Sequence, residues 1–425
     1  MVDLNAWDWE VDKRMVADLR KWKEQFEYME EPYVSPDGEK IAAVVKPGEM
    51  EFSVCENGTA WENSFDKVWN LRYAPDGRLV GLVSDTGAWT VAVDGEPWEE
   101  TFDFVWGTQF SEDGKNIIVA AQSGMKYFAI LNGTGWENKF SFMTNLIVSR
   151  DGLHTAASVQ TIPISEGDIW SFREGCFSAA VDGKAWEKNF VNVWDMDFSA
   201  DGKHLAAEVR TTIHDSTIAV DGKTWPESYP AVWKPKFSPT TNSVTAPVRK
   251  EGAWVLMKDG NQIWDRSFFQ LWHHIYSTDG TNIAAIVAPK FGKWTMAVNG
   301  VPWSLTFGEL VTDGVISKDG RRVACVGKDK GQYYVAVDGV RWNDSFDMVW
   351  KPVFSPQGNH VAVRVEKNGR YFVLVNERNF GQGFKALWDP VFSPDGKKLL
   401  VRGVEDGTDK EQYYRRVVKI SNILG

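Results

Sequence analysis

The side chains with the most chemical potential in this sequence are the aspartates of a recurring Ser/Ala-x-Asp-Gly tetrapeptide, such as "SPDG" at 35–38 and "SADG" at 199–202. Carboxylates repeated in short turns can bind calcium or sugar hydroxyls. The same carboxylates can instead accept hydrogen bonds from backbone N–H groups and so close the turn. Because Thr240 and Gln357 replace the aspartate in two copies, we expect the turn-closing role.

Histidine and cysteine offer little further chemistry. The one histidine pair, His273 and His274, falls in a predicted strand, where adjacent side chains point to opposite faces and cannot easily chelate one ion. Cys55, Cys176 and Cys325 lie far apart, which fits buried thiols in a reducing compartment. No CxxC or CxxCH run, nucleophile elbow, HExxH or phosphate loop occurs. We therefore predict no metal, no cofactor, no catalytic residue and no enzyme.

Charge and hydropathy limit the partners. The net charge is −11 without a basic tail, so we expect neither nucleic acid nor an anionic membrane surface as a partner. The first residues lack an apolar core and a small-residue cleavage site, and no later stretch approaches the roughly 20 apolar residues of a membrane span. We expect a cytoplasmic protein that does not itself cross a membrane.

A repeat supplies the elements that position these residues. The Ser/Ala-x-Asp-Gly turn or a degraded copy occurs ten times, at intervals of 37 to 40 residues with one interval of 50. Nearly every unit also carries an Asn-Gly or Asp-Gly dipeptide, such as Asp94-Gly95, which suits a two-residue hairpin. Between the turns, runs such as "RLVGLVS" and "AWTVAVDG" read as half-buried strands. Four strands a unit predict an all-β fold, a β-propeller of about ten blades.

The 22 tryptophans follow the same period. One series starts a Trp-x3-Phe/Tyr pattern after the hairpin turn, and a second series follows four residues after that Phe or Tyr. We expect both to pack the blades, because a position that recurs in most units belongs to the core. The alternative is that the second series, which Thr144 and Val311 interrupt, forms an aromatic binding surface at one mouth. The structural tryptophans of the two series are Trp61, Trp98, Trp186, Trp225, Trp264 and Trp342, and Trp69, Trp106, Trp194, Trp233, Trp272 and Trp350.

The two ends of the chain complement one another. The tenth unit ends without a Trp-x3-Phe segment, and a spare copy lies in "KWKEQF" around Trp22 and Phe26. We therefore predict one closed ring with an N-terminal closing strand; two smaller propellers are the alternative. The predicted organisation is an N-terminal extension at 1–21 and a propeller at 22–425, with an insertion at 160–175.

The turns "FSPDGK" and "APDGR", followed by "LAA" or "IAA", resemble the WD40-like repeat of TolB-type propellers over almost the whole chain. Together with "VDGKAWEKNF", "VDGVRWNDSF" and "VNGVPWSLTF", the sequence resembles the tryptophan-rich subunit of the transmembrane redox complex, Tmc, of sulfate-reducing bacteria. The resemblance implies a complex with a multihaem cytochrome c, a membrane cytochrome b and an iron–sulfur subunit related to heterodisulfide reductase. It implies no catalytic residue and no cofactor for this subunit.

Residues that break the repeat are the best candidates for a docking site. The insertion at 160–175 carries Ile162, Ile164, Trp170 and Phe172 among acidic residues, and insertions on one face of a propeller commonly contact partners. A loop folded back on its own blade is the alternative. The N-terminal "NAWDWE" supplies a second candidate, with two indoles outside the repeat at Trp7 and Trp9.

From these observations and the resemblance we expect a non-catalytic scaffold of a membrane-bound respiratory complex for sulfate respiration. The chain would dock on the cytoplasmic iron–sulfur subunit and lie peripherally on the inner membrane. The alternative is a free-standing soluble sensor that holds a small ligand in an axial pocket. A hydrolase or lyase is disfavoured, because no acid, base and nucleophile converge in the sequence.

Overall fold

The computed structural model describes residues 2–49, 51–165, 167–407 and 410–425. Within these ranges the strands form ten antiparallel sheets. Each sheet is one blade, numbered 1 to 10 along the chain, and its strands are called a, b, c and d in blade order. The fold is a β-propeller of ten four-stranded blades, as the repeat predicts.

The chain divides into two compact units, which are Met1–Glu99 with Trp303–Gly425, and Glu100–Pro302. The first unit holds blades 1, 2, 8, 9 and 10, and the second unit holds blades 3 to 7. The expected single ring concerns how the two units sit together, and it stays a prediction.

The strands of the first unit are listed by blade. Blade 1 has β2 (Tyr28–Met29), β3 (Tyr33–Val34), β4 (Ile41–Gly48), β5 (Glu51–Glu56) and β6 (Thr59–Ala60), and blade 2 has β7 (Lys67–Tyr73), β8 (Leu79–Asp85), β9 (Ala88–Val93) and β10 (Glu96–Pro97). Blade 8 has β31 (Leu310–Ile316), β32 (Val323–Asp329), β33 (Gln332–Val337) and β34 (Val340–Arg341). Blade 9 has β35 (Met348–Val349), β36 (Val353–Phe354), β37 (Val361–Lys367), β38 (Arg370–Val375) and β39 (Arg378–Phe384). Blade 10 has β40 (Ala386–Leu387), β41 (Val391–Phe392), β42 (Lys398–Gly407), β43 (Lys410–Lys419) and β1 (Lys13–Asp18).

The strands of the second unit follow the same order. Blade 3 has β11 (Phe104–Phe110), β12 (Ile117–Ser123), β13 (Lys126–Leu131) and β14 (Thr134–Gly135), and blade 4 has β15 (Met143–Val148), β16 (Thr155–Gln160), β17 (Phe177–Val181) and β18 (Lys184–Ala185). Blade 5 has β19 (Asn192–Phe198), β20 (Leu205–Arg210), β21 (Ser216–Val220) and β22 (Lys223–Thr224). Blade 6 has β23 (Lys236–Phe237), β24 (Val244–Lys250), β25 (Ala253–Lys258) and β26 (Asn261–Gln262). Blade 7 has β27 (Gln270–Tyr276), β28 (Ile283–Lys290), β29 (Lys293–Val298) and β30 (Val301–Pro302).

The helical elements of the described ranges are short. They are η1 (Leu4–Ala6), α1 (Leu19–Gln25), α2 (Ile169–Glu174) and α3 (Ile420–Leu424). No helix within those ranges has both the length and the apolar character needed to cross a membrane.

Turn chemistry defines the two ends of a blade. The a–b and c–d turns lie at one end, called the a–b end, and the start of strand a and the b–c hairpin lie at the other, called the b–c end. In the a–b turn of blade 3, Ser111 Oγ donates to Asp113 Oδ1 at 2.7 Å, and the N–H of Lys115 donates to the same oxygen at 3.1 Å. In the c–d turn of blade 2, Asp94 and Gly95 have φ of 51° and 93°, the left-handed pair that a tight hairpin requires.

Proline and bulges shape strand a. In blades 1, 9 and 10 this strand is split in two at Pro32, Pro352 and Pro390, because proline has no N–H for the ladder. In blades 2, 3, 4, 7 and 8 a residue with positive φ makes a bulge at the same level, for example Asn70 with φ of 51°.

Strands b and c are buried because their sheets pack against neighbouring sheets within the unit. In β8 the first six residues are buried and only Asp85 is exposed. Ala42 and Val44 of blade 1 form one core cluster with Val68, Leu71 and Val83 of blade 2. The apolar runs of the repeat therefore form strands as predicted, but in the middle of each blade these strands are buried on both faces and not half-buried as expected.

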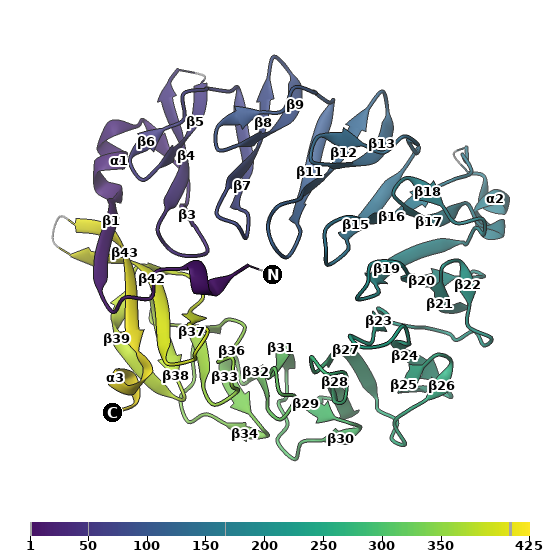
Figure 1. Cartoon of the computed structure of the whole chain (residues 1–425). Helices are drawn as coiled ribbons and strands as arrows, with labels where there is room; N and C mark the ends of the chain where they lie inside the picture. Colours follow the sequence, from purple (N-terminus) through teal and green to yellow (C-terminus); the bar gives the residue numbers. More distant parts are fainter. Residues whose placement is uncertain (1, 50, 166, 408–409) are drawn as a thin grey trace. The chain divides into compact units, whose positions relative to one another are not determined.

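The N-terminal strand completes the last blade, as predicted. β1 pairs antiparallel with β43, with Lys13 opposite Arg416 and Ala17 opposite Tyr413 (Figure 1). The predicted boundary is wrong, however, because the propeller begins at Lys13 and not at residue 22. Trp22 and Phe26, which the sequence placed in the closing strand, instead lie in α1 and at its C-terminal cap. Asp18 caps this run of good helix formers by accepting a hydrogen bond from the N–H of Arg20.

Candidate functional site

The first tryptophan series packs one blade on the next. Trp61 follows strand d of blade 1, and its indole lies against the c–d turn of blade 2, where a Cβ atom at Gly95 would come within 3.0 Å of the ring. Trp264 of blade 6 packs in the same way on Gly300 of blade 7. The role of this series is structural. The same position holds Trp98, Trp186, Trp225 and Trp342, which are buried or half-buried.

The second series pairs with the aromatic residue that starts strand c of the same blade. The pairs are Trp69–Trp89, Trp106–Tyr127, Trp233–Trp254, Trp272–Trp294 and Trp350–Tyr371, with ring centroids 4.8 to 6.5 Å apart. In blade 5 the guanidinium of Arg210 lies 5.4 Å from the Trp194 ring instead. Trp69 and Trp233 are 48% and 41% exposed. This series therefore combines packing within each blade with a partly exposed aromatic row at the b–c end.

The strand register changes which residue interrupts this series in blade 8. Val311 was placed at the tryptophan position, but Thr312 occupies it, because Thr312 pairs with Val326 as Trp272 pairs with Ile286. The reason is one extra residue between Phe307 and the a–b turn of blade 8. Thr144 does hold the position in blade 4.

Exposed apolar side chains gather at the b–c ends of the second unit. They are Met125, Phe142, Ile162, Ile169, Trp170, Trp233, Phe269 and Phe291, and their exposed fractions run from 41% to 83%. We call this set the b–c surface. A chain of ring contacts connects its parts in blades 3 and 4, with successive ring centroids 6.0 to 6.4 Å apart. The rings are those of Trp106, Tyr127, Phe142 and Phe177. Clusters of exposed apolar side chains of this kind mark interaction sites in soluble proteins.

The predicted insertion contributes the most exposed indole of this surface. Trp170 lies in α2 and is 75% exposed, and Ile162 is 43% exposed. Ile164 and Phe172 are half-buried, so the loop is partly folded back on its blade. Asp168 caps α2 by accepting a hydrogen bond from the N–H of Ser171 at 3.0 Å. Residue 166 of the insertion lies outside the described residues.

The two indoles of the N-terminal candidate stack on each other. The ring centroids of Trp7 and Trp9 are 6.2 Å apart, both side chains are half-buried, and Trp9 Nε1 donates to the carbonyl of Leu4 at 2.8 Å. Lys398 Nζ donates to the carbonyl of Trp9 at 2.7 Å, which ties this segment to the a–b end of blade 10. The N-terminal candidate therefore lies at an a–b end in the first unit, whereas the insertion lies at a b–c end in the second unit.

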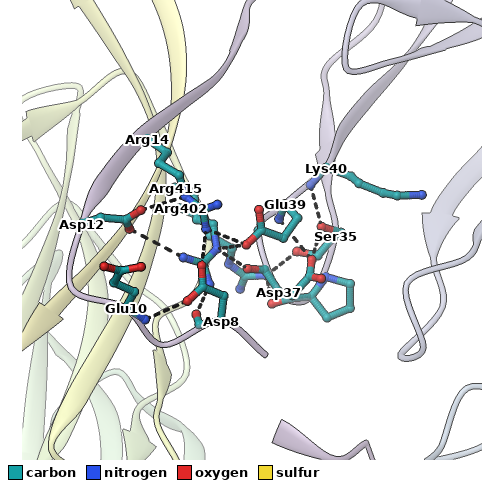
Figure 2. A network of polar contacts seen from close by, with 12 residues as sticks. Asp8, Glu10, Asp12, Arg14, Ser35, Asp37, Glu39, Lys40, Arg402 and Arg415 are labelled. Carbon is teal, nitrogen blue, oxygen red and sulfur yellow. Dashed lines mark hydrogen bonds and ion pairs between the residues drawn. The ribbon is translucent and has the colours of Figure 1, made fainter. Parts of the chain in front are cut away.

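Two buried arginines hold the N-terminal segment and blade 10 to blade 1 (Figure 2). Arg415 is fully buried, and its Nε lies 2.8 Å from Glu39 Oε1 while the guanidinium also donates to the carbonyls of Asp37 and Asp8. Arg402 donates to the carbonyls of Ser35 and Pro36 at 2.9 and 3.0 Å, and burial lowers its pKa. This network is a structural latch.

The aspartate turns and the histidine pair have structural roles as well. The hydrogen bond from Ser111 lowers the pKa of Asp113, so its carboxylate is ionised and engaged in its own turn. His274 is buried with Nε2 2.8 Å from Thr245 Oγ1, and burial lowers its pKa to about 3, whereas His273 is exposed. No cluster of three or more metal-ligating side chains exists among the described residues.

Comparisons with known proteins identify no family for this chain. No family model and no curated protein matches the sequence. A crystal structure of the eukaryotic initiation factor is 12% identical, with a TM-score of 0.47, over 76% of this chain and 88% of that chain. The Dos1 propeller is 11% identical with a TM-score of 0.35 over 96% and 94%, and putative TolB from Agrobacterium tumefaciens is 18% identical with a TM-score of 0.29 over 57% and 95%. The assignment of the propeller stands on the strand pairing of this chain.

A propeller that presents exposed aromatics fits a non-catalytic protein-interaction scaffold. Five residues of the b–c surface were not predicted from the sequence, namely Met125, Phe142, Ile169, Phe269 and Phe291. Ile169 lies beside Trp170 in the insertion, and a signal was present for the other four as well. Met125 and Phe291 stand in b–c hairpins, where polar residues are usual, and Phe142 and Phe269 are extra phenylalanines beside the repeat position.

Proposed function

We propose that this chain is a non-catalytic assembly subunit of a membrane-bound respiratory electron-transfer complex. Its partner is the cytoplasmic iron–sulfur subunit related to heterodisulfide reductase, and the membrane cytochrome b and the multihaem cytochrome c belong to the same complex. The resemblance of the tryptophan-rich repeat supports this choice of complex. The observation that carries the scaffold role is the b–c surface of the second unit.

Trp170 is the anchor of the proposed interface. A large indole that is 75% exposed gains the most from burial against a partner, and tryptophan is enriched among residues that dominate binding energy. Arg173 lies 5.5 Å from its ring and Glu174 is exposed beside it, so the anchor has a polar rim. The partner surface expected from this arrangement is an apolar pocket with charged edges.

Co-purification from native membranes tests the proposal. A tagged full-length chain should bring down the iron–sulfur subunit from detergent-solubilised membranes, and Trp170→Ser should lower the recovered partner about tenfold or more. Leu153→Ser is the matched control, because Leu153 is 61% exposed at the a–b end of the same blade. Equal loss in both variants, or equal retention in both, would contradict docking through the b–c surface.

The visible spectrum and the cell fraction separate this proposal from the alternative. The isolated chain should show no haem or iron–sulfur absorption, whereas the co-purified complex should show both. A chain that stays alone in the soluble fraction under native conditions would instead support a free-standing sensor.

A further inference from the structure

A cavity of about 460 Å³ opens at the b–c ends of blades 9, 10 and 1 in the first unit. Its aromatic wall is formed by Trp350 and Tyr371 of blade 9 and by Trp388 of blade 10. Glu30 and Glu31 of blade 1, which directly follow β2, line the same cavity. Indoles and carboxylates therefore line one space.

The repeat explains why these groups meet. Trp350 and Trp388 hold the second-series position in blades 9 and 10, where each lies five residues before the serine of its own a–b turn. Counted in the same way from Ser35, the position in blade 1 is Glu30. A carboxylate thus replaces an indole next to two blades that keep theirs.

Ion pairs already occupy the other charged groups of the cavity. Glu411 lies 2.8 Å from Lys23 Nζ and 3.0 Å from Lys385 Nζ. Arg364 Nε lies 3.0 Å from Asp389 Oδ1. Each of these three cations therefore has a carboxylate of the same chain beside it, and Lys23 and Lys385 share Glu411.

Glu30 and Glu31 differ from these groups. Neither carboxylate has an ion-pair partner in the ranges that the structure describes. Burial raises the pKa of Glu30, which is the expected effect of partial desolvation without a compensating positive charge. A cation that entered the cavity would supply that charge.

The aromatic wall is suited to a cation as well. The guanidinium of Arg364 lies 4.1 Å from the Trp350 ring centroid, so this wall stabilises one positive charge already. Trp388 is half-buried and contacts Tyr413 edge-on with ring centroids 5.8 Å apart. No cation of the described residues lies over the Trp388 ring.

We propose that this cavity binds a small alkylammonium cation, with its ammonium head between the Trp388 indole and the Glu30 carboxylate. A methylated ammonium head combines the apolar surface that an indole favours with the charge that Glu30 requires. The site does not depend on the proposed scaffold function, since it lies in the first unit and uses none of the b–c surface.

Calorimetric titration of the full chain with three ligands of nearly equal shape tests the charge requirement. The ligands are choline, the neutral 3,3-dimethyl-1-butanol and the anionic 3,3-dimethylbutanoate. Choline should bind about tenfold or more tightly than the neutral ligand, and the anion should not bind. Equal binding of choline and the alcohol, preferred binding of the anion, or no binding of choline would overturn the proposal.

Variants locate the site. Glu30→Gln should weaken choline binding about threefold to tenfold while leaving the fold intact, because Glu30 is exposed at the cavity edge. Trp388→Leu should weaken it by a similar factor, and Trp272→Leu, at the same repeat position in the second unit, should not change it. A melting temperature for each variant checks folding, and unchanged affinity in folded Glu30→Gln would place choline elsewhere.

Discussion

The guanidinium of Arg415, in the last strand of the chain, lies 2.8 Å from the carboxylate of Glu39 in blade 1. Arg415 is fully buried, while Glu39 is partly exposed. The pair therefore joins blade 10, which β1 completes, to blade 1. Its loss should lower the stability of the whole first unit.

Arg415→Met should lower the free energy of unfolding by about 3 kcal/mol, because removing one member of a buried ion pair leaves its partners without compensation. Urea denaturation followed by circular dichroism measures this. Arg14→Met is the control, since the Arg14 side chain is 42% exposed and its pairs with Asp8 and Glu39 should contribute less than about 1 kcal/mol. Similar losses in the two variants would show that burial does not set the strength of this latch.

Deletion of residues 2–18 should make the chain self-associate. Without β1, the outer edge of β43 presents unpaired N–H and C=O groups over several residues, and such an edge pairs with other chains. Light scattering coupled to size-exclusion chromatography reports the mass. Deletion of residues 2–6, which spares the strand and Asp8, should leave the mass unchanged, so self-association of this shorter variant would argue against the edge as its cause.

Trp136→Phe should destabilise the chain more than the equivalent change one blade later. Trp136 Nε1 donates to Thr155 Oγ1 at 2.8 Å, and Asp182 accepts from the N–H of Thr155 and lies 2.7 Å from His154 Nδ1. Losing the buried hydrogen bond should cost about 1 kcal/mol beyond the lost packing. The control is Trp186→Phe, because Leu205 stands at the position of Thr155 in the next blade. Thermal melts measure the two losses. An equal fall in melting temperature for both variants would contradict a contribution from the Trp136–Thr155 hydrogen bond.

Glu208 should make stability fall as the pH rises. Burial and the nearby Asp195 raise the pKa of Glu208 from 4.5 to about 8 in the folded chain. The folded state therefore holds a proton that the unfolded state releases, so this contribution is complete below about pH 4.5 and is lost as the pH rises through about 8. The loss is on the order of 3 kcal/mol for a group this buried. Glu208→Gln should reduce the fall of the unfolding free energy with pH between pH 5 and 8. An unchanged slope would assign the pH dependence to other groups.

The blades were predictable because their signals are local and repeated. Each Asp-Gly or Asn-Gly turn, such as Asp94-Gly95, needs only its own backbone conformation, and its recurrence in nearly every unit averages out the exceptions. The closing strand was predictable only in part. The segment "KRMVAD" carries no repeat signal, and its partner β43 lies at the far end of the chain, so tertiary pairing alone decides that Lys13–Asp18 is a strand.

The candidate surface was harder to predict than the blades. Trp170 and Ile162 stood out because they interrupt the repeat, but Ile164 and Phe172 in the same insertion are half-buried, and sequence distance does not reveal which way a loop folds. Phe142 and Phe291 form part of the surface only because strand pairing places them at the b–c ends. The substitution of Glu30 for an indole becomes visible only when units are counted backwards from their turns.

The pairing of β1 with β43 also sets an order of events during synthesis. β1 leaves the ribosome before the other strands, yet its partner β43 follows roughly 400 residues later, which is about 20 to 80 s at ordinary translation rates. Throughout that time the nascent chain carries an unpaired strand while nine blades form behind it. The charges of Lys13, Arg14 and Asp18 should keep this unpaired strand soluble, so a strand made before all the others becomes part of the last blade to be finished.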